Sequence, residues 1–312
     1  MNVFGITKAG QQVHQITLTA GDLTVSLLTW GAVIRDVRRK GIDRSLTLGS
    51  DNFADYETTM QHHGALIGPV ANRISTARVR LDGMMHELER NQDGRIHLHS
   101  GAQATHLQVW KLTDQTTNSA TLSLNLADGV CGLPGNRKIS VTYTVTAPAT
   151  LTMQVHGVTD AKTLMNFANH SYWNLDGSDN YAGHQLQIAA AHYLPCTDDA
   201  CPTGDIADVS DTEMDFRKGR TIAPHDPPFD NSFCLSTGQT ALRDVLELTG
   251  QSGLCMRMAT TEPGLQIYDG RPTYAGLAIE AQGWPDAPNN HGFPSIIVTP
   301  ETPYSQTTRW TF

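Results

Sequence analysis

Residues 139–155, ISVTYTVTAPATLTMQV, indicate the fold class more clearly than any other stretch of the chain. Apolar side chains occupy every second position, first from Ile139 to Val145 and then from Leu151 to Val155. Alternation of this kind places one set of side chains on a core face and the other towards solvent, as in a half-buried β-strand. The segment therefore predicts two adjacent strands.

The same period of two recurs along the chain, at 16–27, 79–81 and 122–126. Asp82-Gly83 follows the second of these runs and favours a tight hairpin turn. Long segments with a 3.6-residue period are missing, and only Val245–Leu248 suggests a short helix. This pattern predicts an all-β fold, a large antiparallel β-sandwich with few short helices. Without a repeat or a composition break, residues 1–312 are expected to form a single domain.

The composition restricts the possible partners. Of the 312 residues, 39% are hydrophobic and 17% are charged, and the formal net charge is −9. An acidic chain without clustered Lys or Arg is a poor binder of nucleic acid or anionic membranes, and no apolar run is long enough for a membrane helix. A neutral small molecule is compatible with this charge. The oligomeric state is expected to be a monomer or a homodimer.

The cysteines and the N-terminus suggest a cellular location. Five cysteines are an odd number, and their spacing shows no metal-binding knuckle, which is typical of reduced thiols in a cytoplasmic protein. The first ten residues, MNVFGITKAG, lack the basic start and apolar stretch of a signal peptide. We therefore expect a cytoplasmic location.

Histidines are the most conspicuous candidates for chemistry. Thirteen are present, and two lie in polar motifs: His99 in RIHLHSG (95–101) and His170 in NFANHSYWNL (166–175). Histidine readily transfers protons near neutral pH. On a strand, His97 and His99 would share a face, so a zinc site completed by His106 is an alternative interpretation.

The C-terminal third indicates a sugar rather than an ester or a nucleotide. No nucleophile elbow or phosphate-binding loop is present in the sequence. The segment GLAIEAQGWPDAPN (276–289) places Trp284 among hydrogen-bonding side chains. A pyranose ring, with an apolar face and a rim of hydroxyls, suits such surroundings.

Taken together, these motifs resemble the galactose mutarotase (aldose 1-epimerase) family over nearly the whole chain. The resemblance rests on their shared order. The matching segments are LTWGAVI (28–34), IGPVANRI (67–74), LHSG (98–101), NHSYWNL (169–175), FDNSFCL (229–235), PGLQIY (263–268), EAQGWPDAPN (280–289) and QTTRWTF (306–312).

The resemblance implies a β-sandwich with an open cleft, a monosaccharide substrate, and neither metal nor cofactor. It implies interconversion of α and β anomers by acid and base catalysis, through opening and closure of the sugar ring. By this analogy His170 is the general acid at the ring oxygen and His99 polarises the ring oxygen or O1. The residues expected to bind the sugar are Arg73, Asn72, Asp230, Gln282 and Tyr268.

The base is harder to assign. The resemblance implies a Pro-Gly-Glu-x-Tyr pattern near the C-terminus, whose Glu is the base in this family, whereas this chain has Pro300-Glu-Thr-Pro-Tyr304, with Thr302 at the Glu position. Threonine is too weakly acidic to act as a base at neutral pH. Glu301, one residue earlier, is the preferred candidate, and Glu280 is an alternative. Pro69 is a second departure, because many family members carry Arg there.

Two other functions are compatible with the sequence. A hexose-6-phosphate 1-epimerase would need arginines that converge on the phosphate, for which Arg78, Arg80 and Arg90 are available. A non-catalytic sugar-binding or regulatory module would follow if the displaced glutamate had removed the base.

Overall fold

The structure is a computed structural model that describes residues 2–271 and 273–312. Its largest element is a nine-stranded sheet, whose neighbouring strands pair antiparallel. In spatial order the strands are β10 (Lys111–Gln115), β11 (Ser119–Leu126), β12 (Arg137–Thr146), β13 (Thr150–Thr159), β27 (Tyr304–Thr311), β23 (Cys255–Thr260), β22 (Arg243–Thr249), β17 (Gln185–Ile188) and β20 (Arg220–Thr221).

Two further sheets accompany the large one. A four-stranded sheet consists of β1 (Asn2–Ile6), β2 (Gln12–Ala20), β3 (Leu23–Leu28) and β4 (Ile34–Arg39). A six-stranded sheet has the order β16 (Tyr172–Trp173), β25 (Leu277–Gln282), β24 (Gly264–Tyr268), β21 (Asp230–Cys234), β18 (His192–Leu194) and β19 (Ala207–Asp208).

The remaining elements are short. Four two-stranded pairs are β5 (Leu66–Ile67) with β15 (Ala168–Asn169), β6 (Arg73–Ile74) with β9 (His97–Leu98), β7 (Arg78–Leu81) with β8 (Met84–Glu87), and β14 (Thr163–Leu164) with β26 (Ile297–Val298). The helical elements are α1 (Phe53–Tyr56) and the 3-10 turns Gly101–Gln103, Thr105–Leu107, Val130–Gly132 and Ala287–Asn289. Among the described residues, no helix is long and apolar enough to cross a membrane.

The alternating runs form the strands that the sequence predicts. β12 and β13 pair in register from Arg137 with Thr159 to Thr146 with Thr150, and Val141, Tyr143 and Met153 are buried. The hairpin at Asp82-Gly83 joins β7 and β8. The all-β sandwich prediction is confirmed. The suggestion of a helix at Val245–Leu248 is wrong, because these residues lie within β22.

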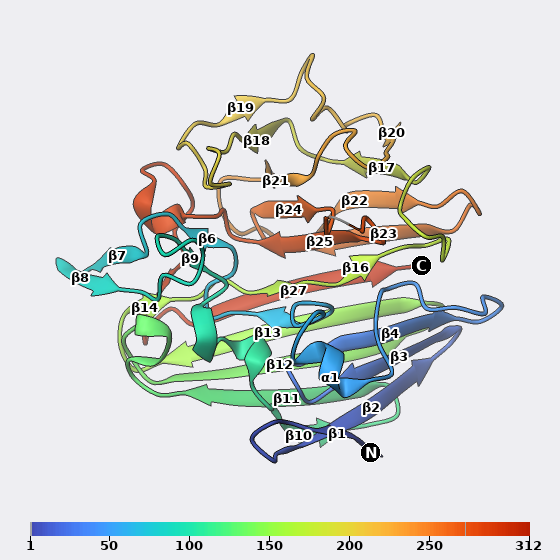
Figure 1. Cartoon of the computed structure of the whole chain (residues 1–312), viewed down its shortest axis with the longest axis horizontal. Coiled ribbons are helices and arrows are strands. Elements are labelled where there is room, and N and C mark those ends of the chain that lie inside the picture. Colours follow the sequence, from blue (N-terminus) through green and yellow to red (C-terminus); the bar gives the residue numbers. More distant parts are fainter. Residues whose placement is uncertain (1, 272) are drawn as a thin grey trace.

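One hydrophobic core connects the three sheets. It contains Val25 of the four-stranded sheet, Val141 and Trp310 of the nine-stranded sheet, and Ile279 of the six-stranded sheet. Figure 1 shows the blue strands β2–β4 beside β11–β13 in the lower half, and the orange strands β24 and β25 in the upper half. The organisation of residues 1–312 as a single domain stays a prediction.

The six-stranded sheet gathers polar side chains on one face. Directly opposite residues of an antiparallel pair point to the same side. The register pairs Asp230 with Tyr268 and Gln266 with Glu280, so four polar side chains from β21, β24 and β25 share that face. Ile267, between them in sequence, points the other way into the core.

The contact between the sheets generates a prediction about stability. The buried Tyr143 hydroxyl donates a hydrogen bond of 2.8 Å to the carbonyl oxygen of Ala32, in the turn between β3 and β4. Tyr143→Phe leaves that carbonyl buried without its donor, and we expect a loss of about 1–3 kcal/mol in the free energy of unfolding. Urea denaturation measures the change.

The matched control is Tyr193→Phe. The Tyr193 hydroxyl makes no hydrogen bond with the residues that the structure describes, so its removal is expected to leave the stability nearly unchanged. Equal losses in the two variants would show that the Tyr143–Ala32 bond does not join the sheets.

Candidate active site

A cleft of about 300 Å³ opens over the polar face of the six-stranded sheet. This volume is at the lower end of the range for small-ligand pockets, about 300–1,000 Å³. Its side chains come from β6, β9, β16, β21, β24 and β25 and from the connecting loops. The lining residues are His62, Asn72, Arg73, Leu98, His99, His170, Tyr172, Asp230, Gln266, Tyr268, Arg271 and Glu280.

Two carboxylates line the described part of the cleft, Glu280 and Asp230, and Glu280 is the one without an arginine partner. It lies in β25 with only 2% of its surface exposed, and its Oε2 is buried with no hydrogen-bond partner among the described residues. Burial raises its pKa to about 8, with a further increase from the Asp230 charge and an opposing decrease from Arg73. A carboxyl group with a pKa in this range can gain and lose a proton near neutral pH.

His170 lies against this carboxyl group. Its Nε2 is 3.4 Å from Oε1 of Glu280, and its side chain is also buried. The backbone hydrogen bonds of His170 to Ala65 and Gly64 hold its segment beside the loop that precedes β5. Burial lowers the pKa of His170 well below its usual value, and His62 and His63 add to that decrease. These shifts favour a neutral imidazole beside a protonated carboxyl group.

His99 is fixed in one orientation and one tautomer. The backbone N–H of Asn72 donates to the ring nitrogen Nδ1 of His99 over 3.1 Å, and the backbone N–H of His99 donates to the Asn72 carbonyl over 3.0 Å. An imidazole nitrogen that accepts a hydrogen bond carries no proton, so Nε2 carries the proton of the neutral ring. Burial lowers the pKa of His99 well below its usual range. His99 is thus a neutral hydrogen-bond donor.

The backbone of this corner is unusual. Asn72, His99 and Ser100 have φ values of 62°, 50° and 64°, in the left-handed region that few non-glycine residues adopt. Such conformations persist where the surrounding structure holds them, often at functional sites. The Ser100 hydroxyl, bonded to the backbone of Val70 at 2.8 and 3.0 Å, contributes to that support.

An ion pair occupies another part of the cleft. Arg73 meets Asp230 through two hydrogen bonds of 3.2 and 3.4 Å, while its Nε donates to Gln92. Gln266 donates to Asp230 over 2.8 Å. The guanidinium and the carboxylate are thereby held as one rigid group of donors and acceptors, which suits vicinal hydroxyls of a ligand.

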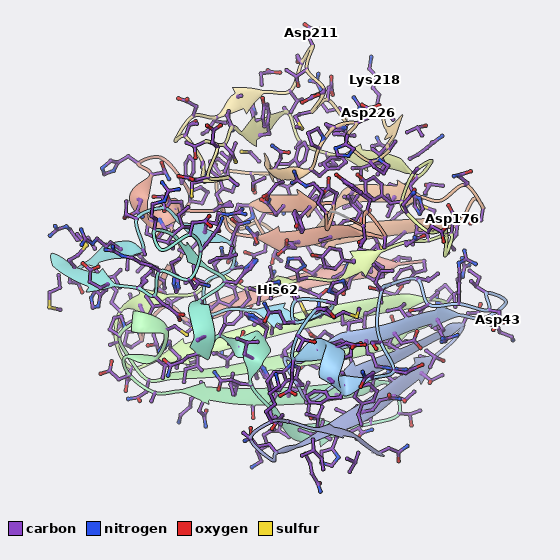
Figure 2. The ribbon with its side chains drawn as sticks, in the orientation of Figure 1. Asp43, His62, Asp176, Asp211, Lys218 and Asp226 are labelled. Atoms are coloured by element: carbon purple, nitrogen blue, oxygen red, sulfur yellow. The ribbon has the colours of Figure 1, made fainter. Side chains whose placement is uncertain are left out.

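The sequence did not indicate His62, Gln266 or Tyr172. The His62 ring lies 5.1 Å from His99, 5.1 Å from His106 and 5.6 Å from His170, measured between ring centroids. Figure 2 shows His62 near the centre of the molecule, whereas Asp43, Asp176, Asp211 and Asp226 lie towards its outline. Burial lowers the pKa of His62 to about 4. Its segment consists of turns without a period, so no sequence pattern marked it.

Most of the predicted site residues lie together, but two do not. The structure brings His170, His99, Arg73, Asn72, Asp230 and Tyr268 to one cleft. Glu301 lies on an exposed turn closed by a bridge between Thr299 and Thr302, so the preferred base of the sequence analysis is outside the cleft. The turn keeps its side chain in solvent, and Glu280 is the carboxylate beside His170. Gln282 is completely buried and is also absent from the described lining residues.

The alternative zinc interpretation fails on backbone geometry. His97 and His99 would share a face only in an extended strand, but β9 ends at Leu98 and His99 has a positive φ. His97 Nδ1 instead bonds the Glu89 carbonyl at 2.7 Å. In residues 2–271 and 273–312, no group of three His, Cys, Asp or Glu side chains is arranged to hold a metal ion.

The arginines considered for a phosphate lie on the β7–β8 hairpin and just beyond it. Arg78 and Arg90 both pair with Glu87, and Arg80 donates to the carbonyl of Gly83. These contacts hold the three guanidinium groups at the hairpin itself, and none of the three arginines is among the described lining residues of the cleft.

Comparison with known proteins agrees with this geometry. The aldose 1-epimerase family model matches residues 14–311. Galactose mutarotase from Rattus norvegicus is 32% identical over 99% of this chain and 97% of its own length, and aldose 1-epimerase from Escherichia coli is 29% identical over 97% and 96%. The chain belongs to the aldose 1-epimerase family.

Solved structures show the same fold. An aldose epimerase homologue from C. elegans superimposes with a TM-score of 0.89 at 28% identity, over 96% of this chain and 98% of that one. Galactose 1-epimerase from Lactobacillus acidophilus gives 0.85 at 25% identity, over 99% and 97%.

The raised pKa of Glu280 predicts a pH-dependent stability difference. Between pH 4.5 and about 8 the folded state retains a proton that the unfolded carboxyl loses, so this group makes the protein less stable as pH rises through that window. Glu280→Gln removes the penalty. We expect its Tm to exceed that of the wild type by several degrees at pH 8, since about 1 kcal/mol corresponds to about 2–4 °C.

The difference should shrink towards pH 5, and differential scanning calorimetry across this range measures it. Glu301→Gln, on an exposed turn, is the control and should follow the wild type. A Glu280→Gln variant that is equally destabilised at every pH would contradict the shifted carboxyl.

Proposed function

We propose that this chain is an aldose 1-epimerase that interconverts the α and β anomers of a free aldose, with Glu280 as base and His170 as acid. The observation that carries the proposal is the contact of 3.4 Å between the buried His170 Nε2 and Glu280 Oε1 in a sugar-sized cleft. Anomer interconversion needs one proton donor and one acceptor within reach of O1 and the ring oxygen, and this pair supplies both.

Ring opening uses the ionised form of the pair. A proton moves from Glu280 to His170, and the carboxylate then removes the proton of the O1 hydroxyl. The O1–H electrons form the C1=O1 double bond, the C1–O5 bond breaks, and its electron pair takes the His170 proton at the ring oxygen. The products are an open-chain aldehyde, a protonated Glu280 and a neutral His170.

Ring closure reverses these transfers on the other face of C1. Rotation about the C1–C2 bond presents the opposite face of the aldehyde to the O5 hydroxyl. His170 accepts the O5 proton as the C1–O5 bond forms, and Glu280 returns a proton to O1. Each residue ends in the state in which it started, so no other reactant is consumed.

His99 stabilises the charge that develops on oxygen. Its Nε2 proton is fixed by the Asn72 N–H at Nδ1, so the ring can donate to O1 or to the ring oxygen without reorganising. Preorganised donors of this kind lower the barrier because they need no rearrangement during the reaction.

The Arg73–Asp230 pair and Gln266 bind the hydroxyls away from C1. Both cleft arginines are already paired, Arg73 with Asp230 and Arg271 with Asp269. This pairing favours a neutral aldose over a hexose phosphate. The monomeric or homodimeric state and the cytoplasmic location stay predictions from the sequence.

Polarimetry of freshly dissolved α-D-galactose and α-D-glucose tests the catalytic roles. We expect the wild type to accelerate the anomeric relaxation of at least one of them. Glu280→Gln and His170→Asn should each lower kcat by about 10²–10⁴, the usual contribution of a general acid or base.

Glu301→Gln is the matched carboxylate control and should retain wild-type kcat. If Glu301→Gln lost the activity and Glu280→Gln kept it, the assignment of the base would be reversed. A wild-type protein that binds sugars but leaves the relaxation of a wide panel of aldoses unchanged would be a non-catalytic sugar-binding module.

A second kinetic prediction concerns Asp230. Asp230→Asn removes the charge that holds Arg73 and Gln266 around the sugar hydroxyls. We expect KM to rise by about tenfold or more with a smaller change in kcat, the signature of lost ground-state binding. Asp198→Asn, at an exposed position, is the control. A fall in kcat with unchanged KM would instead place Asp230 in the chemical step.

A further inference from the structure

A second chamber of about 420 Å³ adjoins the cleft. Four residues line both spaces, namely His62, Tyr172, Tyr268 and Arg271. The other described residues of the chamber are Leu48, Thr59, Met60, His63, Gly270, Thr273, Ala275 and Gly276. Because the two spaces share these four residues, the chamber can receive a group that is attached to a sugar in the cleft.

The chamber borders the acid on one side, and on the other it borders Tyr268, which lies opposite Asp230 in the β21–β24 register. The His170 ring lies 5.1 Å from Tyr172 and 5.6 Å from His62, measured between ring centroids, and both of these residues line the chamber. Arg73 and Asp230 are not among its described lining residues. A group in the chamber therefore lies near the sugar atom that faces His170.

The proposed mechanism puts the ring oxygen at His170. In a pyranose the ring oxygen is bonded to C5, and C5 carries C6, so the O6 substituent is the one nearest to this side of the ring. Substituents at O3 or O4 would instead extend towards the end held by Arg73 and Asp230. The position of the ring oxygen at His170 rests on the proposed function.

The lining indicates a neutral, sugar-like occupant. Tyr172 stacks on His63 with ring centroids 4.2 Å apart, and Tyr268 offers a second aromatic surface. Aromatic faces with hydroxyl and imidazole edges suit the apolar face and the hydroxyl rim of a pyranose. Arg271 lies over Tyr268, and its charge is compensated by Asp269 at 2.8 Å, so it leaves little excess charge for an anion.

We propose that the chamber is a second sugar subsite, which accepts a neutral glycosyl unit attached at O6 of the aldose. The enzyme would then convert the anomers of reducing (1→6)-linked disaccharides as well as those of free monosaccharides. The chamber is larger than the cleft that holds the first ring, so it offers room for a second ring of the same size.

The test compares melibiose, a (1→6)-linked disaccharide, with its reducing unit glucose and with the (1→4)-linked maltose. Thr59→Trp and Met60→Trp place a bulky ring at the chamber and do not alter the described lining of the cleft. Thr58→Trp is the matched control, because Thr58 is exposed and its hydroxyl bonds the Ala54 carbonyl instead.

We expect the wild type to act on melibiose with a kcat/KM close to that for glucose and above that for maltose. Filling the chamber should lower kcat/KM for melibiose by about tenfold or more, as when binding of one unit is lost, and leave glucose nearly unchanged. Thr58→Trp should affect neither. Activity on glucose without activity on melibiose, a preference for maltose, or equal losses on both sugars in the filled variants would overturn the subsite.

Calorimetric titration with melibiose separates the subsite from the catalytic proposal. If the wild type turned over no sugar but bound melibiose more tightly than glucose, and Thr59→Trp removed that difference, the subsite would stand and the proposed function would fall. Equal affinity for the two sugars, unchanged in Thr59→Trp, would refute the subsite whatever the activity.

Discussion

The desolvation of Glu280 is the constraint on which the rest of the site depends. A carboxylate buried in a strand is unfavourable unless it is protonated or paired. Here burial is the largest cause of the raised pKa of Glu280; the Asp230 charge raises this pKa further, and Arg73 lowers it. The same burial keeps His170 neutral. The proton of the pair therefore lies on Glu280, and the imidazole beside it is the group that must receive a proton before the ionised pair can act on a sugar.

The fold was accessible from sequence where alternation is regular, and it was obscured where the strand is irregular. β12 alternates apolar and polar residues from Ile139 to Val145 and β13 does so from Leu151 to Val155, so the apolar positions of these runs predict the core directly. β22 has a register shift between Asp244 and Leu246, which buries Val245 and Leu246 in succession. That local bulge removes the period of two, and the segment then looks helical.

Site residues could be predicted from the sequence where they lie in a polar motif. They could not be predicted where the pairing of two strands decides which side chains lie next to them. His99 and His170 stand out as imidazoles among small polar residues. Glu280 lies in a strand that is buried throughout, Leu277–Gln282, which has the appearance of core packing. Its carboxyl group reaches the cleft because Glu280 of β25 lies directly opposite Gln266 of β24. Both strands are distant in sequence from the histidines of the site. A motif near the C-terminus therefore drew attention to Glu301 instead.

Charge compensation inside the cleft explains how an acidic protein can select a neutral ligand. Arg73 is balanced by Asp230, Arg271 is balanced by Asp269, and Glu280 holds a proton over much of the neutral range. A ligand that enters the cleft meets fixed hydrogen-bond donors and acceptors, but only a small net charge. Discrimination must then come from the positions of hydroxyl groups, because a buried donor or acceptor left unpaired by the wrong epimer is costly. The rigidity of the Arg73–Asp230–Gln266 group makes that cost hard to avoid by rearrangement.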